Sequence, residues 1–225
     1  MELVHASEPR HALRGTLCFA LLLYVSWVGA WVLEQELEHR SVWMTTSGGR
    51  FAYWTAMKLL LWVLPAVILL RRAGPRLCEV MGLRRVRSIV LWGGGIGLVF
   101  AASALITRAI GHRPLFASRV GWPFVGGVIV APIVEEIAFR GAILQGLLTR
   151  YRFMAANTLT AILFMGIHLP GWHFQGRLWD MLADPVGGAL SILIIGWIFG
   201  LVAYRGRSVA ASTLTHVLNN LFSAS

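Results

Sequence analysis

Seven runs of apolar residues, separated by short polar connectors, dominate the pattern of the chain. The runs are 14 to 25 residues long, and a helix that crosses a bilayer needs about 20 mostly apolar residues. They predict an all-α, polytopic bundle of transmembrane helices that forms a single membrane domain over residues 1–225. The predicted spans are Thr16–Leu33, Phe51–Leu70, Ile89–Ile106, Phe124–Leu148, Ala155–Leu169, Val186–Tyr204 and Val209–Phe222.

Composition narrows the class of protein further. Hydrophobic residues make up 57% of the chain and charged residues only 13%, whereas about a quarter of a soluble domain is charged. The net charge of +10 raises the question of nucleic-acid binding, which requires a basic patch or run on a soluble module. The basic residues here lie mostly in the connectors, so we expect the lipid bilayer as surroundings and no nucleic-acid partner.

The distribution of arginine predicts the orientation in the membrane. Twelve arginines fall in connectors on the side of the N-terminus and six in connectors on the other side. Because positive charge is retained in the cytoplasm, the N-terminus is predicted inside and the C-terminus outside. All but one of the basic residues are Arg, a bias typical of GC-rich bacterial genomes. We therefore expect an integral protein of a bacterial plasma membrane.

The fourth predicted span contains an unusual group of charged residues. Glu135, Glu136 and Arg140 lie within six residues of one another, although ionisable groups inside a span are costly and mark functional sites. Glu136 and Arg140 are four residues apart and can pair on one helix face. Glu135 is turned by about 100° from Glu136 and is left without a partner. Pro132 lacks an N–H, which frees the carbonyl of Val128 and predicts a bend before the acids.

A histidine in the fifth span is predicted at the depth of these acids. Glu135 lies fourteen residues before Thr149, and His168 lies fourteen residues after Met154. At 1.5 Å per residue, both are about 21 Å from the inner face of the membrane. Antiparallel neighbours joined by a short turn would bring the two side chains level. His168 is therefore a candidate for a site shared with Glu135, rather than an interfacial residue.

The seventh span is too polar to face lipid on all sides, because hydrogen-bonding groups need partners inside the bilayer. His216 and Asn220 are four residues apart and share a face, while Asn219 is turned away. Ser212 and Thr213 are interpreted as polar contacts between helices. The His–Asn pair is the third element of a candidate site.

The carboxylates, the two histidines and the asparagine are together the residue types that a hydrolase uses. A carboxylate and an imidazole can hold and deprotonate a water molecule. An imidazole N–H and a carboxamide N–H can stabilise the oxyanion of a tetrahedral intermediate. The residues therefore favour hydrolysis of a carbonyl compound inside the membrane.

At these residues the chain resembles the CPBP family, which contains CAAX proteases, bacteriocin-processing proteins and Ras-converting endopeptidases. The motif EExxxR matches Glu135, Glu136 and Arg140; FxxxH matches Phe164 and His168; HxxxN matches His216 and Asn220. The three motifs occur in order, each in an apolar run. The resemblance covers a catalytic core of about residues 120–225, and family members with eight spans leave eight as the alternative count.

The resemblance implies an intramembrane glutamic endopeptidase without metal or other cofactor. Glu135 and His168 would activate water, His216 and Asn220 would form the oxyanion hole, and Glu136 with Arg140 would orient the site. The substrate would be a membrane-anchored protein or peptide, cut in a CAAX-like or sorting-signal tail. Two alternatives remain open: a zinc protease with Glu135, His168 and His216 as ligands, and a non-enzymatic transporter or bacteriocin-immunity protein.

Overall fold

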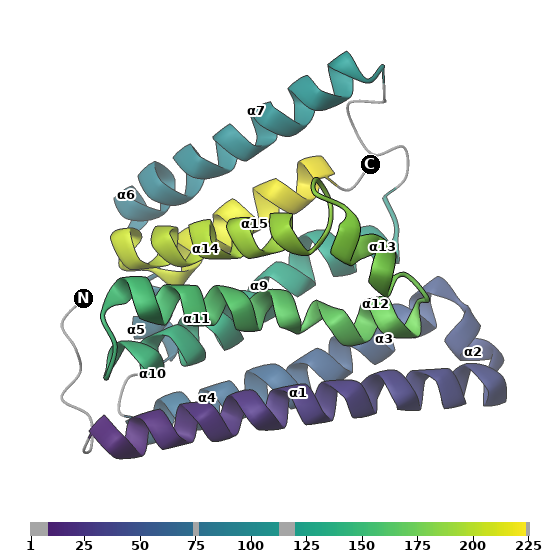
Figure 1. The fold of residues 1–225 in the computed structure, drawn as a ribbon, viewed down its shortest axis with the longest axis horizontal. Coiled ribbons are helices and arrows are strands. Elements are labelled where there is room, and N and C mark those ends of the chain that lie inside the picture. The colour runs from purple at the N-terminus through teal and green to yellow at the C-terminus, as the bar shows by residue number, and fades with distance from the viewer. Residues whose placement is uncertain (1–8, 74–76, 113–119, 224–225) are drawn as a thin grey trace.

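The computed structural model describes residues 9–73, 77–112 and 120–223, and every regular element in these ranges is a helix (Figure 1). The all-α prediction is confirmed. Several rods change between α- and π-helical geometry (η) without a break. In chain order the elements are α1 (Pro9–Arg40), α2 (Val42–Thr45), α3 (Ser47–Lys58), η1 (Leu59–Val63), α4 (Leu64–Ala73), α5 (Leu77–Met81), α6 (Val86–Ser88), η2 (Ile89–Gly94), α7 (Gly95–Ile110), α8 (Trp122–Val125), η3 (Gly126–Val130), α9 (Ala131–Glu136), η4 (Ile137–Ile143), α10 (Leu144–Leu148), α11 (Phe153–Gly166), α12 (His168–Phe174), α13 (Leu178–Ala183), α14 (Ala189–Gly206) and α15 (Val209–Ser223).

Five helices in the described ranges are long and apolar enough to cross a membrane, so the predicted count of seven spans is not confirmed. The other two predicted runs correspond to the rod over residues 122–148 and to the 15-residue helix α15. The fifth run does not end at Leu169, because helical structure continues through α12 as far as Phe174. The five helices are Ala12–Arg40, Ser47–Arg72, Val86–Ile110, Phe153–Phe174 and Ala189–Gly206.

The rod over residues 122–148, which we name the central helix, lies inside the bundle. In Figure 1, α1 and α4 lie on one side of it and α7 on the other, and α15 packs between the central helix and α7. Every residue from 134 to 144 is buried. Polar groups on this helix therefore have protein partners rather than lipid around them, which is how ionisable residues are tolerated at membrane depth.

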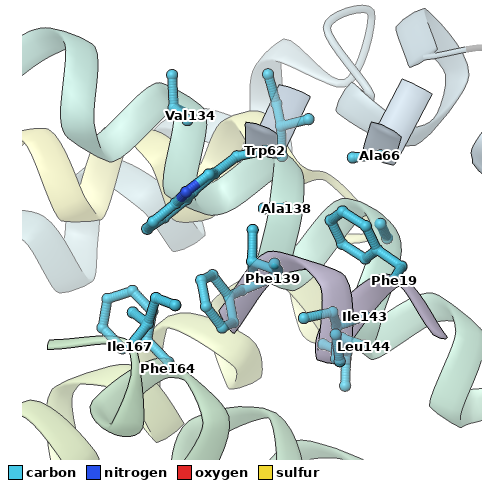
Figure 2. Close-up of a cluster of buried hydrophobic side chains, with 14 of the residues drawn as sticks. Phe19, Trp62, Ala66, Val134, Ala138, Phe139, Ile143, Leu144, Phe164 and Ile167 are labelled. Atoms are coloured by element: carbon cyan, nitrogen blue, oxygen red, sulfur yellow. The ribbon is translucent and has the colours of Figure 1, made fainter. Parts of the chain in front are cut away.

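Aromatic side chains surround the central helix and fix its position. Phe139 is fully buried and packs edge-to-face against Trp62 on one side and Phe164 on the other, at ring-centroid distances of 6.0 and 5.2 Å (Figure 2). Such pairs contribute about 0.5–1.5 kcal/mol beyond the burial of their area. Large apolar side chains on the outer helices, such as Leu21 and Leu98, are instead more than 60% exposed. An outward apolar surface of this kind suits a bilayer.

Small residues allow the helices around the central helix to approach closely. A Cβ on Gly93 would lie 2.5 Å from the carbonyl oxygen of Ala211, and one on Gly97 would lie 2.4 Å from Leu218. These two glycines bring η2 and α7 against α15. Gly200 similarly receives the side chain of Asn157 from α11. Glycines therefore mark close helix packing at these positions in the third and sixth predicted spans.

The two ends of the bundle differ in charge. Among the arginines whose side chains are described, ten lie at one end, four lie at the other and Arg140 lies between them. We name the first the arginine-rich end; it holds the start of α1 and the α14–α15 turn (Figure 1). Its ten arginines are Arg14, Arg71, Arg72, Arg84, Arg85, Arg87, Arg150, Arg152, Arg205 and Arg207.

Candidate active site

Glu136 is the centre of a buried polar cluster. Its side chain has no exposed surface, and one oxygen, Oε1, accepts a hydrogen bond from Arg140 at 2.8 Å. The same oxygen lies 3.1 Å from Nδ1 of His216. The hydroxyl of Ser212 donates to the other oxygen, Oε2. A carboxylate with three donors is fully compensated, which suits a group that holds its neighbours in place.

Arg140 connects this cluster to two further helices. Its NH2 group donates to the carbonyl of Gly196 on α14 at 2.5 Å. Its guanidinium lies 4.5 Å from the ring centre of Phe164 and 5.5 Å from that of Phe199. A Cβ at position 196 would lie 2.7 Å from Phe164 and 3.5 Å from Arg140 NH2. Glycine at this position therefore permits the close approach of the guanidinium to the α14 backbone.

Glu135 also has a partner, so the prediction of an unpaired carboxylate was wrong. Lys58 at the end of α3 places its Nζ 2.8 Å from Glu135 Oε1. Both side chains are largely buried, with 15% and 10% of their surface exposed. The Lys58 ammonium also lies 5.2 Å from the ring centre of Trp62 and 5.9 Å from that of Trp27. The carboxylates of Glu135 and Glu136 thus pair with the cations of Lys58 and Arg140, so the formal charges of the cluster balance.

Lys58 was not predicted as a residue of the site, although its position in the sequence indicated that it needs a partner. It lies inside the predicted second span and is the single lysine of the chain. A lone cation in an apolar run requires a partner as much as a lone acid does. Glu34 was likewise placed outside the spans, but α1 continues to Arg40 and Glu34 is 5% exposed. Trp54 donates from Nε1 to Glu34 at 3.0 Å.

The two motif histidines approach Glu135 from different helices. His216 on α15 places Nε2 3.9 Å from Glu135 Oε2, so its ring lies between the two carboxylates. His168 begins α12, and its Nδ1 lies 2.8 Å from the carbonyl of Phe164. Because a carbonyl only accepts, Nδ1 carries the proton and Nε2 keeps its lone pair. Glu135 is within electrostatic range of both rings, as the predicted equal depth requires.

Asn220 faces the backbone of the central helix. The π-helical turn η3 shifts the hydrogen bonds by one residue, and the N–H of Ala131 bonds to Gly126. Pro132 follows and has no N–H to offer to the carbonyl of Gly127. The side chain of Asn220 donates to this carbonyl from Nδ2 at 2.9 Å. Pro132 was predicted to free the carbonyl of Val128. The carbonyl to which Asn220 donates is instead that of Gly127.

Asn220 also accepts a hydrogen bond, at 3.0 Å from Nδ2 of Asn219. Within the described part of the chain, it makes no hydrogen bond to either carboxylate or to His216. Its second amide hydrogen is left for another acceptor. Asn220 therefore lies one helical turn beyond His216 on α15. It is hydrogen-bonded to the backbone of the central helix at Gly127, before Glu135 and Glu136 in the chain.

A groove leads from the surface to Lys58, the partner of Glu135. Its volume is about 620 Å³, and it lies between α1, α3 and the start of the central helix. Among the elements that line it, α2 and the start of α3 lie at the end of the bundle opposite the arginine-rich end (Figure 1). Five aromatic side chains form part of its wall. The aromatic residues that line it are Trp27, Trp31, Phe51, Trp54 and Trp122.

Three His, Cys, Asp or Glu side chains grouped closely enough to hold a metal ion do not occur among the described residues. The cluster instead consists of ion pairs and hydrogen bonds between side chains. Two imidazoles near a carboxylate are groups that can take part in acid–base chemistry.

Comparison with known families agrees with this geometry. Residues 117–222 match the family model "type II CAAX prenyl endopeptidase Rce1-like". Over this region, slightly less than half of the chain, the sequence is similar to the Rce1-like family. The matched region contains the whole central helix, the motif histidines His168 and His216, and Asn220, whereas Lys58 lies outside it. No curated protein and no solved structure matches the chain.

This match confirms the predicted resemblance to the CAAX proteases. Together with the apolar helices, it places the chain among integral membrane proteases. Hydrolysis of a protein substrate is the activity that goes with this family.

Proposed function

We propose that the chain is an intramembrane glutamic endopeptidase that cuts membrane-anchored proteins with water activated by Glu135 and His168. The observation that carries the proposal is the convergence of Glu135, His168 and His216 beside Lys58, which lines a groove and pairs with Glu135. These residues come from three separate helices. A purely structural ion pair needs neither the two imidazoles nor the groove.

In the proposed reaction, Glu135 removes a proton from water while Nε2 of His168 accepts a hydrogen bond from the same molecule. The hydroxide attacks the carbonyl carbon of the scissile peptide bond. When the C–N bond breaks, Glu135 returns the proton to the leaving amine. Lys58 keeps the carboxylate compensated and in position through its 2.8 Å contact.

His216 and Asn220 are proposed to stabilise the oxyanion that forms in this step. His216 has its Nδ1 on Glu136, so it donates through Nε2 only when that nitrogen also carries a proton. Carboxylates on both sides supply the counter-charge for such a ring. Asn220 contributes its second amide hydrogen, the first being used on Gly127.

The groove is proposed to admit the substrate. Its aromatic wall favours an apolar peptide segment, and its basic residues Arg50 and Lys58 are already paired with Glu38 and Glu135. If the arginine-rich end is cytoplasmic, as the positive-inside rule predicts, the groove opens toward the outer leaflet. Processing of a tail close to the outer surface of a bacterial plasma membrane would suit this arrangement.

The experiment that tests the proposal uses the full chain reconstituted in lipid nanodiscs with a set of membrane-anchored peptides. Mass spectrometry of the products is expected to find a single cleavage site, with and without a zinc chelator. Loss of cleavage in chelator would favour the zinc alternative. Absence of cleavage from every peptide tested, together with unchanged protein termini in membranes lacking the protein, would favour a transporter or immunity protein.

A His168→Ala variant is expected to cleave the same peptide about 10²-fold or more slowly, because the water loses one of its two acceptors. His173→Ala is the matched control: it lies on the same helix α12, and its rate should stay close to that of the unmodified protein. Equal losses in both variants would mean that α12 matters only for folding.

His216→Ala and Asn220→Ala are each expected to slow cleavage by about 10²-fold or more if they donate to one oxyanion. Because they act on the same atom, the double variant should be little slower than either single one. Asn220→Ala should also lower the unfolding temperature, since the carbonyl of Gly127 loses its donor. Rate losses that multiply in the double variant would contradict a shared oxyanion site.

A further inference from the structure

A second concave site lies at the arginine-rich end, far along the bundle from the groove. Two turns build it: the one between α10 and α11, and the one between α14 and α15. Its volume is about 540 Å³. We name it the arginine pocket; its polar and aromatic lining consists of Tyr151, Arg152, Phe153, Tyr204, Arg205 and Arg207.

Positive charge dominates the arginine pocket. Its lining contains three guanidinium groups and no carboxylate. Among the described residues, none of Arg152, Arg205 and Arg207 takes part in an ion pair. Helix α11 also begins here, and its first turn has neither a side-chain cap nor an acidic residue. The positive end of this 14-residue helix therefore adds to the field of the arginines.

The backbone around the pocket is held in place. Arg207 adopts a left-handed conformation (φ 49°), and the N–H of Ser208 bonds to the carbonyl of Ala203 at 3.1 Å. The hydroxyl of Ser208 donates to the carbonyl of Met81 at 2.9 Å. The turn is thus connected both to α14 and to α5. A site fixed in this way does not have to be ordered by its ligand.

The walls of the pocket combine charge with an apolar, lipid-facing surface. The rings of Phe153 and Tyr204 stack at 4.1 Å, joining the two turns. Tyr151 and Tyr204 are 41% and 37% exposed, as is usual for aromatic residues at a membrane interface. The next residue on α11, Met154, is 62% exposed. An anion bound here would have an apolar helix surface directly beside it.

The geometry points to the arginine pocket as a binding site for the phosphate headgroup of an anionic phospholipid. Guanidinium groups bind phosphate oxygens through paired, charge-assisted hydrogen bonds. Basic pockets between transmembrane helices are suited to such headgroups. The exposed apolar surface next to the pocket supplies a place for the acyl chains, which a free phosphate ion would leave uncovered.

The test measures how strongly phosphatidylglycerol is retained by the purified full chain. Native mass spectrometry in detergent, with equimolar phosphatidylglycerol and phosphatidylcholine, should find one tightly held phosphatidylglycerol. The double variant Arg152→Gln/Arg205→Gln should bind it about tenfold or more weakly, because two charge-assisted contacts are lost. The control Arg71→Gln/Arg72→Gln removes the same charge from exposed positions at the same end, and should bind like the unmodified chain.

Equal weakening in both double variants would overturn the proposal, since it would mean general attraction to a basic surface. Binding of glycerol phosphate as tight as that of the lipid would also overturn it, in favour of a soluble phosphate ligand. Unfolding temperatures measured in phosphatidylcholine alone verify that each variant is folded. A variant with a lowered temperature is replaced by the single change Arg205→Gln, for which weaker retention is again expected.

Discussion

A Glu135→Gln variant is expected to reach the membrane in normal amounts and to cleave no detectable substrate. Glutamine keeps the shape of the side chain but cannot take a proton from water, so general-base catalysis is lost. Loss of this step is expected to reduce the rate by about 10²–10⁴-fold. Its carbonyl can still accept from Lys58, which lies 2.8 Å from the carboxylate. Cleavage is measured in nanodiscs beside Glu36→Gln, a variant at an exposed carboxylate that pairs with Arg40.

Turnover of Glu135→Gln near that of the unmodified protein would contradict the role of Glu135. A second variant separates the loss of the base from the loss of the ion pair. Glu135→Gln/Lys58→Met removes both charges and should recover any stability that the single change costs, because no unpaired cation remains. It should stay inactive. Recovery of cleavage in this double variant would mean that only charge balance was needed.

The parts of the site that follow from local geometry could be predicted from the sequence. The Glu136–Arg140 pair is one, since helical residues four apart are neighbours whatever surrounds them. The approach of His168 to Glu135 is another. The two residues lie equally far from the short turn that joins their antiparallel helices, so they are at the same depth. The positions of the main helices could also be predicted, because each of them corresponds to an apolar run.

Contacts between distant segments could not be predicted in this way. Lys58 and Glu135 are 77 residues apart in the chain, and Arg140 and Gly196 are 56 apart. Which helix faces which depends on packing, here on the glycines of α14 and on the aromatic side chains around Phe139. No period or motif encodes these pairings. The lone lysine in an apolar run indicated that a partner must exist, but not which acid it would be.

The number of spans could also not be predicted from hydropathy alone. Apolar runs show that a segment avoids water, whereas crossing a bilayer requires length as well. Helix α15 is apolar but has only 15 residues, and it is packed among η2, α7, α9 and α14. The central helix contains π-helical turns on both sides of the acids. Such turns are frequent at functional sites, and no simple sequence rule locates them.

An Arg140→Ala variant is expected to lose both stability and activity. Arg140 is fully buried, and its removal leaves Glu136 as a buried charge without its main partner. Breaking a buried ion pair in this way costs about 3–5 kcal/mol. The carbonyl of Gly196 loses its donor and the rings of Phe164 and Phe199 lose the guanidinium between them. Thermal unfolding of the purified chain, together with its yield in membranes, measures the loss.

The double variant Glu136→Gln/Arg140→Met tests whether that loss comes from charge. It contains no buried ion at either position, so it should unfold at a higher temperature than Arg140→Ala. Its cleavage rate should remain low, because a glutamine side chain in place of Glu136 cannot supply the carboxylate that holds Nδ1 of His216. If Arg140→Ala is as stable as the unmodified chain, the pair does not contribute to folding. If the double variant cleaves normally, Glu136 and Arg140 do not position His216.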